Sequence, residues 1–116
     1  MYWISLMKTY DDFIEKYGKC HNSVIYTDEG KVIIDTSNEY VYVTNIDNPR
    51  TTRFDGPVYI WNKKDQNGKC IVEWWINGHH VTTKIIQWAK ENDIDLDNLS
   101  DVDKALIKIV WADYGK

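Results

Sequence analysis

The stretch Cys70-Ile71-Val72-Glu73-Trp74-Trp75-Ile76-Asn77-Gly78-His79-His80-Val81-Thr82 decides the fold. Residues 70–76 are apolar, aromatic or β-branched except for Glu73, and such residues favour a strand. Asn77-Gly78 follows at once, and both residues tolerate the positive φ angles of a type I′ turn. We therefore predict a strand that reverses at 77–78 and returns through 79–81.

Side chains alternate between the two faces of a strand, so this strand carries a tryptophan on each face. One face carries Cys70, Val72, Trp74 and Ile76, and the other carries Ile71, Glu73 and Trp75. Large rings on both faces predict either a central strand that is covered on both sides or a sheet with one face used for binding.

The length of 116 residues predicts a single domain over residues 1–116, which we expect to be α+β. Six Trp and eight Tyr stand against only two Phe, and the net charge is −4. An acidic balance argues against binding to nucleic acid or to anionic membranes. The chain has no apolar run of about 18 residues, so we expect no membrane span.

Cys20 and Cys70 lack a C-x-x-C motif and are typical of reduced cytosolic thiols, with a single disulfide as the alternative.

Ahead of the hairpin, the pattern predicts one helix and several short strands. Thr9 or Asp11 opens the helix and Gly18 ends it, with acids near its start and lysines near its end. Its apolar face is expected to carry Tyr10, Phe13, Ile14 and Tyr17. Turn residues separate short strands expected over 23–27, 31–36, 39–44 and 57–62, and residues 2–7 are expected to form an edge strand.

Two helices are predicted in the last third of the chain. The first covers 84–92, with Thr82 or Thr83 as its N-cap. The second covers 102–111 and opens with a capping-box variant, Ser100 and Asp103. Its buried stripe is expected to be Val102, Leu106, Ile109 and Val110. The predicted fold is thus α+β, an antiparallel meander of about six short strands with a short N-terminal helix and two C-terminal helices packed on one face.

Part of the chain resembles a module of small tailed-bacteriophage proteins. The matching residues follow the pattern R-x-D-G-P…E-W-W-x-N-G, and they are Arg53, Asp55-Gly56-Pro57, Glu73-Trp74-Trp75 and Asn77-Gly78. Residues 88–99 are also similar to small phage proteins, whereas the residues before Arg50 are not matched. The resemblance implies a phage accessory protein that acts in the host cytoplasm by binding and inhibiting a host bacterial protein or a defence system.

An acidic segment links the two predicted C-terminal helices. It comprises Glu91, Asp93, Asp95, Asp97, Asp101 and Asp103. A calcium loop that began at Asp93 would need Gly at position six and an acid at position twelve, where Asn98 and Lys104 stand. Two interpretations remain open: a solvated corner between helices, or an acidic binding surface formed by Asp93, Asp95, Asp97 and Asp101.

The sequence contains no recognisable catalytic or metal-binding motif. His79 and His80 are adjacent, so their side chains point to opposite faces of a strand and do not readily share one metal ion. The chain has no Gly-rich phosphate loop and no G-x-S-x-G or H-E-x-x-H motif. We therefore predict no metal, no cofactor and no catalytic residues; an enzyme would require a Cys, His and Asp grouping that only folding creates.

The aromatic residues form a second candidate binding surface, besides the acidic one. Tyr40, Tyr42, Tyr59, Trp61 and Trp75 are expected on one sheet face, with Arg50 and Arg53 in a neighbouring loop. Either the C-terminal helices cover this face, or the rings form a platform for a protein or for nucleotide bases. We expect a protein-binding inhibitor, with a nucleotide-binding protein that uses an aromatic and arginine pocket as the alternative. The target and the oligomeric state are left open.

Overall fold

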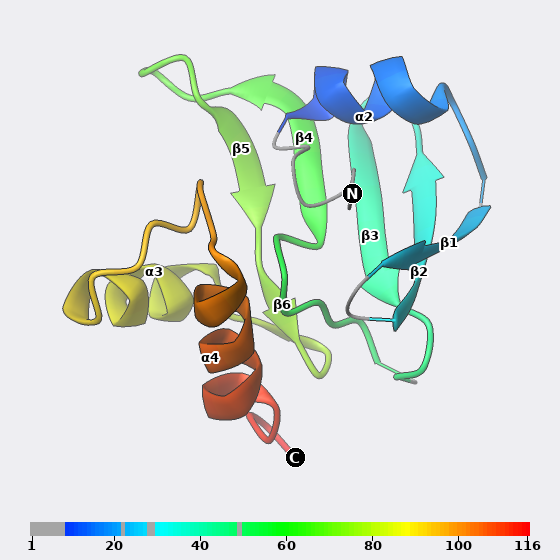
Figure 1. Ribbon diagram of the computed structural model, residues 1–116. Coiled ribbons are helices and arrows are strands. Elements are labelled where there is room, and N and C mark those ends of the chain that lie inside the picture. Colours follow the sequence, from blue (N-terminus) through cyan, green and yellow to red (C-terminus); the bar gives the residue numbers. More distant parts are fainter. Residues whose placement is uncertain (1–8, 22, 28–29, 49) are drawn as a thin grey trace.

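The computed structural model describes residues 9–21, 23–27, 30–48 and 50–116, so the predicted edge strand over 2–7 lies outside the described residues. A five-stranded antiparallel sheet has the order β1-β2-β3-β4-β5 (Figure 1). Its strands are β1 (Ser23–Thr27), β2 (Gly30–Thr36), β3 (Tyr40–Asn45), β4 (Tyr59–Lys64) and β5 (Cys70–Glu73). A second sheet pairs β6 (Trp75–Ile76) with β7 (His79–His80).

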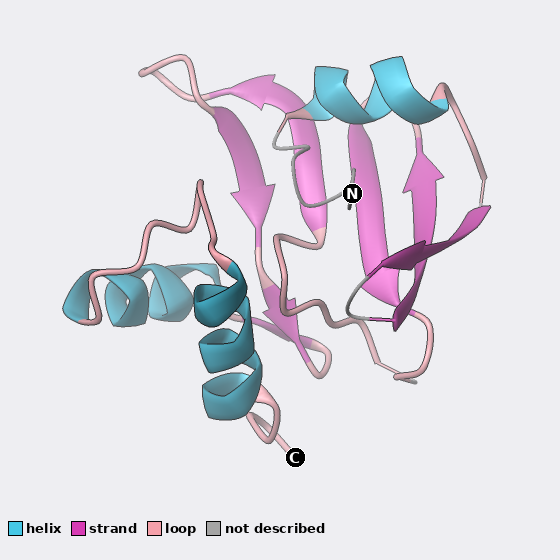
Figure 2. Cartoon of the chain, in the orientation of Figure 1, coloured by secondary structure: helices cyan, strands magenta, loops and turns pink. Residues whose placement is uncertain are grey.

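The three described helices occupy opposite ends of the molecule. Helix α2 (Tyr10–Tyr17) lies across one end of the large sheet, whereas α3 (Thr82–Glu91) and α4 (Asp101–Trp111) gather beside β6 (Figure 2). The predicted α+β class, with one short N-terminal helix and two C-terminal helices, is therefore confirmed.

Helix α2 covers the first part of the core. Thr9 is its N-cap in a reciprocal capping box with Asp12, and Gly18 ends it with a φ of 64°. Phe13 is fully buried against the valine face of the sheet, where Val41 and Val43 are also fully buried. The predicted apolar face of this helix is thus confirmed.

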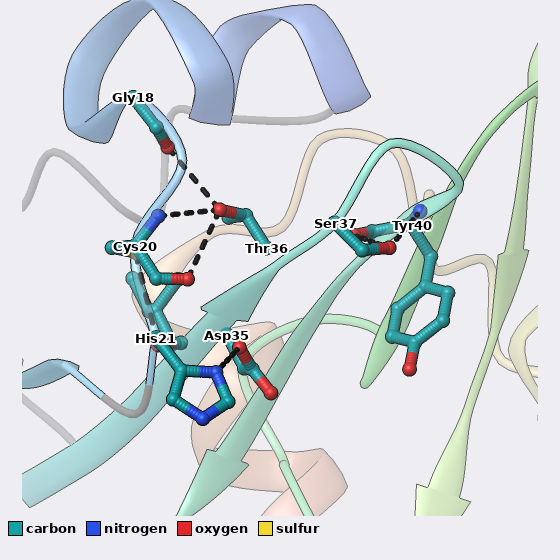
Figure 3. Close-up of polar contacts among 8 residues, drawn as sticks. Gly18, Cys20, His21, Asp35, Thr36, Ser37 and Tyr40 are labelled. Carbon is teal, nitrogen blue, oxygen red and sulfur yellow. Dashed lines mark hydrogen bonds and ion pairs between the residues drawn. The ribbon is translucent and has the colours of Figure 1, made fainter.

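The segment after α2 is tied to β2 through one hydroxyl group. The Thr36 Oγ1 atom accepts from the Cys20 backbone N–H at 2.6 Å and lies 3.3 Å from the Gly18 carbonyl oxygen (Figure 3). Ser37 Oγ accepts from the backbone N–H of Tyr40 and orders the turn into β3. The strands on either side of this turn, β2 and β3, pair in a register that aligns Asp35 with Tyr42.

A second core lies under the 70–82 hairpin. Trp74 and Ile76 are buried against Ile85 of α3 and against Ile107 and Trp111 of α4. Val72 packs against both cores. Because Val72, Trp74 and Ile76 alternate along the chain, both cores lie on the same side of the hairpin strand. The predicted division of residues 70–76 into two faces is confirmed.

Of the two alternatives predicted for residues 70–76, the covered central strand is wrong. Residues 70–73 form β5, which is an edge strand of the large sheet, and the strand then changes partners at Trp74. The Trp74 N–H donates to Thr82 Oγ1 at 2.9 Å, and its carbonyl accepts from the Val81 N–H at 2.8 Å. The turn itself follows the prediction, with φ angles of 49° at Asn77 and 82° at Gly78.

The N-cap predicted for the first C-terminal helix, Thr82 or Thr83, is wrong, and the helix covers Thr82–Glu91 where 84–92 was predicted. Val81 is the N-cap of α3. Thr82 lies in the first turn of the helix, and its hydroxyl oxygen accepts a hydrogen bond from the Trp74 backbone N–H. A threonine that binds a neighbouring strand is not free to cap its own helix. The capping box of Ser100 and Asp103 at the start of α4 is present as predicted.

The buried stripe predicted for α4 is also wrong. Val102 and Ile109 are 76% and 78% exposed, and Val110 is 48% exposed, whereas Ile107 and Trp111 are buried. Trp111 packs edge-on against Trp88 of α3, with ring centroids 6.0 Å apart. The helix carries apolar residues on two sides, and the large indole determines which side faces the core.

Candidate binding surface

Five aromatic rings form a continuous cluster on the sheet face opposite both cores. We call this cluster the aromatic platform, and its members are Tyr40, Tyr42, Tyr59, Trp61 and Trp75. All five rings are half-buried. The large sheet brings them together because β3 and β4 pair Tyr40 with Trp61 and Tyr42 with Tyr59. The prediction that these residues share one face is confirmed by their ring contacts.

Tyr59 stands at the centre of the platform. Its ring centroid lies 5.0 Å from that of Tyr42, 5.4 Å from that of Tyr40 and 6.1 Å from those of Trp61 and Trp75. Burial raises the pKa of the Tyr59 phenol, and the neighbouring Tyr42, Tyr40 and Glu73 raise it further. The phenol therefore stays neutral under physiological conditions and behaves as part of an apolar ring surface.

Glu73 places a carboxylate among these rings. Its Oε2 atom accepts from the Trp61 indole N–H at 2.9 Å, and its Oε1 atom accepts from the Trp75 indole N–H at 3.0 Å. The side chain of Glu73 is 26% exposed, so the carboxylate is reachable from solvent. Both indoles are thus held in place by one charged group, and the strand alternation alone would have placed Glu73 on this face.

His80 extends the platform across the small hairpin. The type I′ turn pairs Trp75 with His80, and the two rings stack with planes 6° apart and centroids 5.1 Å apart. The His80 Nε2 atom lies 2.7 Å from Thr82 Oγ1 and 3.8 Å from Glu73 Oε1. The register of a two-residue Asn-Gly hairpin is the signal in the sequence that could have located His80 here.

No helix of the described residues packs on the platform. The buried residues of α2 belong to the first core, and those of α3 and α4 belong to the second. Because both cores lie on the other side of the strands, the interpretation that the C-terminal helices cover the rings does not hold for the described part of the chain.

Arg53 does not lie on this surface, and its assignment to an exposed binding site is corrected. It is 2% exposed. Its Nε atom donates to Asp55 Oδ1 at 2.7 Å, and its Nη1 atom donates to the Pro57 carbonyl at 2.7 Å. A buried charge requires such partners, so the R-x-D-G-P residues form an internal support for the loop between β3 and β4.

Arg50 remains exposed, beside the turn of the small hairpin. Its Nη1 atom donates to the Asn77 carbonyl at 3.3 Å, and its aliphatic stem lies beside Gly78. Thr51, the next residue, contacts the hydroxyl group of Tyr42 at 2.9 Å. Arg50 therefore lies beside the hairpin turn, next in the chain to a residue that contacts the platform.

The four aspartates of the predicted acidic surface are exposed and serve mainly local structure. Asp95 Oδ1 accepts from the Asp97 backbone N–H at 3.0 Å, and Asp97 pairs with Lys69. This contact with Asp97 raises the pKa of the Lys69 ammonium group. Asp93 takes a positive φ of 57° after α3, and Asp101 begins α4.

A groove of about 420 Å³ runs beside the edge strand β5. Ile86, Ala89, Ile94 and Leu96 form its apolar wall, while Asp95 and Asp97 lie at its rim. It contains Trp74 but no arginine. The pocket that a nucleotide-binding protein would need, with an aromatic ring and an arginine together, is therefore not formed here.

The described histidines and cysteines do not gather into a metal site. No group of three or more His, Cys, Asp or Glu residues there is placed to hold a metal ion. His80 faces Trp75, whereas His79 packs edge-on against Tyr114. Cys20 and Cys70 are free and half-buried, and both pack against the first core.

No protein-family model, no curated protein and no solved structure matches this chain. None of the helices in the described ranges has the length and apolar character needed to cross a membrane.

Proposed function

We propose that this chain is a binding protein that docks a protein partner on the aromatic platform. One observation carries the proposal: five contacting tyrosine and tryptophan rings lie on the sheet face opposite both cores. These rings are half-buried and leave ring surface open to a partner. Tyrosine and tryptophan are enriched at protein interfaces, where they dominate the free energy of binding.

The resemblance to small tailed-phage proteins supports a finer proposal. On that basis the chain is a phage accessory protein, and its partner is a protein or a defence component of the bacterial host, which it inhibits in the cytoplasm. The residues that carry the resemblance divide into two groups. Arg53 and Asp55 support the loop behind the platform, and Glu73 and Trp75 belong to the surface itself.

Nucleotide binding has less support. The charged group among the rings is the Glu73 carboxylate, which repels phosphate. Arg53, which was expected to meet a phosphate, is buried with Asp55 and the Pro57 carbonyl. A protein partner therefore fits the platform better than a nucleotide does.

The test is affinity capture from bacterial lysate with the tagged chain. The variant Tyr40→Ser/Trp61→Ser removes two rings from the platform without touching either core. A matched control, Val102→Ser/Ile109→Ser, removes exposed apolar surface from α4. The proposal expects one host protein in stoichiometric amount with the wild-type chain and with the α4 control, and at least a tenfold loss with the platform variant.

Two outcomes would overturn the proposal. If the platform variant recovers the partner as well as the wild-type chain does, the rings are not the docking surface. If only the α4 control loses the partner, the exposed strip of Val102, Ile109 and Val110 is the interface instead. Circular dichroism of both variants ensures that a loss of capture is not a loss of fold.

A further inference from the structure

We infer that the platform receives an arginine side chain of its protein partner, bound to the Glu73 carboxylate. The inference rests on the proposed function and specifies which chemical group of the partner the platform binds. Glu73 is a negative charge set among aromatic rings and open to solvent over 26% of its side chain. A charge that a partner would desolvate needs an opposite charge from that partner.

The carboxylate has acceptor capacity left. Each of its oxygen atoms accepts one indole N–H, from Trp61 or from Trp75. A carboxylate offers about four acceptor positions in total, so about two remain. No lysine or arginine among the described residues forms an ion pair with Glu73. His80 Nε2, at 3.8 Å, lies closer to Thr82 than to this carboxylate.

The shape of the surroundings favours arginine over lysine. A guanidinium group is flat, donates two parallel N–H groups to a carboxylate, and lies against aromatic faces. The Tyr59 and Trp61 rings are 21° from parallel with centroids 6.1 Å apart, so they offer similarly oriented faces beside Glu73. Cations bind such faces through the ring quadrupole. The ammonium group of lysine satisfies only the charge, because it is a compact and strongly hydrated donor.

The overall charge of the chain agrees with a cationic partner. The net charge is −4, and the guanidinium of Arg50, in the loop next to the platform, donates to the Asn77 carbonyl. An acidic protein attracts a basic patch and repels an acidic one during encounter. The positive group should therefore come from the partner.

The probe is blocked arginine, N-acetyl-arginine amide, titrated into the full chain at constant ionic strength. Blocked citrulline, which is neutral with nearly the same shape, and blocked lysine serve as comparisons. The readout is the NMR signal of the six tryptophan indole N–H groups, two of which donate to Glu73. The inference expects saturable shifts confined to Trp61 and Trp75, at least fivefold weaker binding of lysine, and no response to citrulline.

Two variants separate the site from general electrostatics. Glu73→Gln removes the charge, and we expect at least a tenfold weaker response to arginine. Asp101→Asn makes the same change in net charge at a side chain that is 95% exposed and off the platform, and its response should equal that of the wild-type chain. Glu73→Asp keeps the negative charge. It serves as a second test variant if Glu73→Gln changes the positions of the Trp61 and Trp75 indoles.

Some results would overturn the inference. An equal response to citrulline, an unchanged response of Glu73→Gln, or shifts spread over all six indoles would each do so. If arginine gives no shift while the platform variant still loses its captured protein, this inference fails and the proposed function stands. If arginine shifts the two indoles while the platform variant still captures its partner, the proposed function fails instead.

Discussion

Gly56 lies directly against the guanidinium group of the buried Arg53. A Cβ atom at residue 56 would meet the Arg53 Cζ atom at 2.6 Å. Such a contact normally relaxes when the opposing atom ends a flexible side chain. Here the guanidinium is held by Asp55 and by the Pro57 carbonyl, so it has nowhere to move. The glycine of the R-x-D-G-P motif is therefore required by the arginine of the same motif.

The first prediction follows from this contact. Gly56→Ala should lower the free energy of unfolding by about 1–3 kcal/mol, because an added methyl group in a tightly packed site displaces its neighbours. Urea denaturation measures the change. In the Arg53→Ala background the same substitution should cost much less, because the opposing group is gone. Equal costs in both backgrounds would show that the guanidinium is not what excludes the methyl group.

Asn77 joins the hairpin to the end of the chain, and this gives the second prediction. Its Nδ2 atom donates to the carbonyls of Ala112 at 2.8 Å and Tyr114 at 2.9 Å. Asn77→Gly keeps the positive φ and should cost about 1–3 kcal/mol, because two part-buried carbonyls lose their donor. Asn77→Asp should cost more, because a carboxylate would face those two carbonyls. Thermal unfolding measures the stability of both variants. An unfolding temperature of the aspartate variant equal to that of the wild-type chain would contradict this prediction.

The raised pKa of Tyr59 makes stability depend on pH in the alkaline range. Below pH 10.0, the ordinary pKa of a tyrosine phenol, both states hold the proton and the group has no effect. Above it the unfolded chain releases its proton first, so the free energy of unfolding falls as the pH rises through the higher folded pKa. Burial also raises the pKa of Tyr17, which adds a dependence of the same sign.

Tyr59→Phe isolates the contribution of this one phenol. Between pH 9 and 11.5 the variant should lose stability less steeply than the wild-type chain does, and a urea titration at each pH measures both slopes. Absorbance near 295 nm should show one late-ionising phenol fewer in the variant. Identical slopes would mean that the Tyr59 phenol is equally solvated in both states.

The orientation of α4 supplies the fourth prediction. Ile107→Ala removes a fully buried side chain and should cost about 2–5 kcal/mol. Ile109→Ala, two residues along the same helix, changes a side chain that is 78% exposed and should alter stability by less than about 0.5 kcal/mol. The pair is matched in chemistry and differs only in burial. The reverse order of costs would restore the stripe that the helical periodicity predicted.

Local patterns predicted much of this structure. The Asn77-Gly78 turn, the capping box at Ser100, and the division of residues 70–76 into two faces all follow from the sequence. Each depends on backbone preferences or on a fixed periodicity within a few residues. The same alternation predicted that the platform rings share one face.

Other features required contacts between residues distant in the chain. The two-sided apolar pattern of α4 left its orientation open until Trp111 met Trp88. The sequence predicts Arg53 as an exposed cation in a loop. In the folded loop it is buried and paired with Asp55. The place of Glu73 between two indoles depends on the pairing of β4 with β5.

The sequence by itself therefore determined the elements, their turns and the faces of their strands, since these depend on neighbours along the chain. Tertiary structure decided which charged group is buried, which helix face is covered and which sheet face the described helices leave uncovered. Those outcomes depend on packing between segments far apart in sequence, where the largest side chains and the need to pair a buried charge select one arrangement.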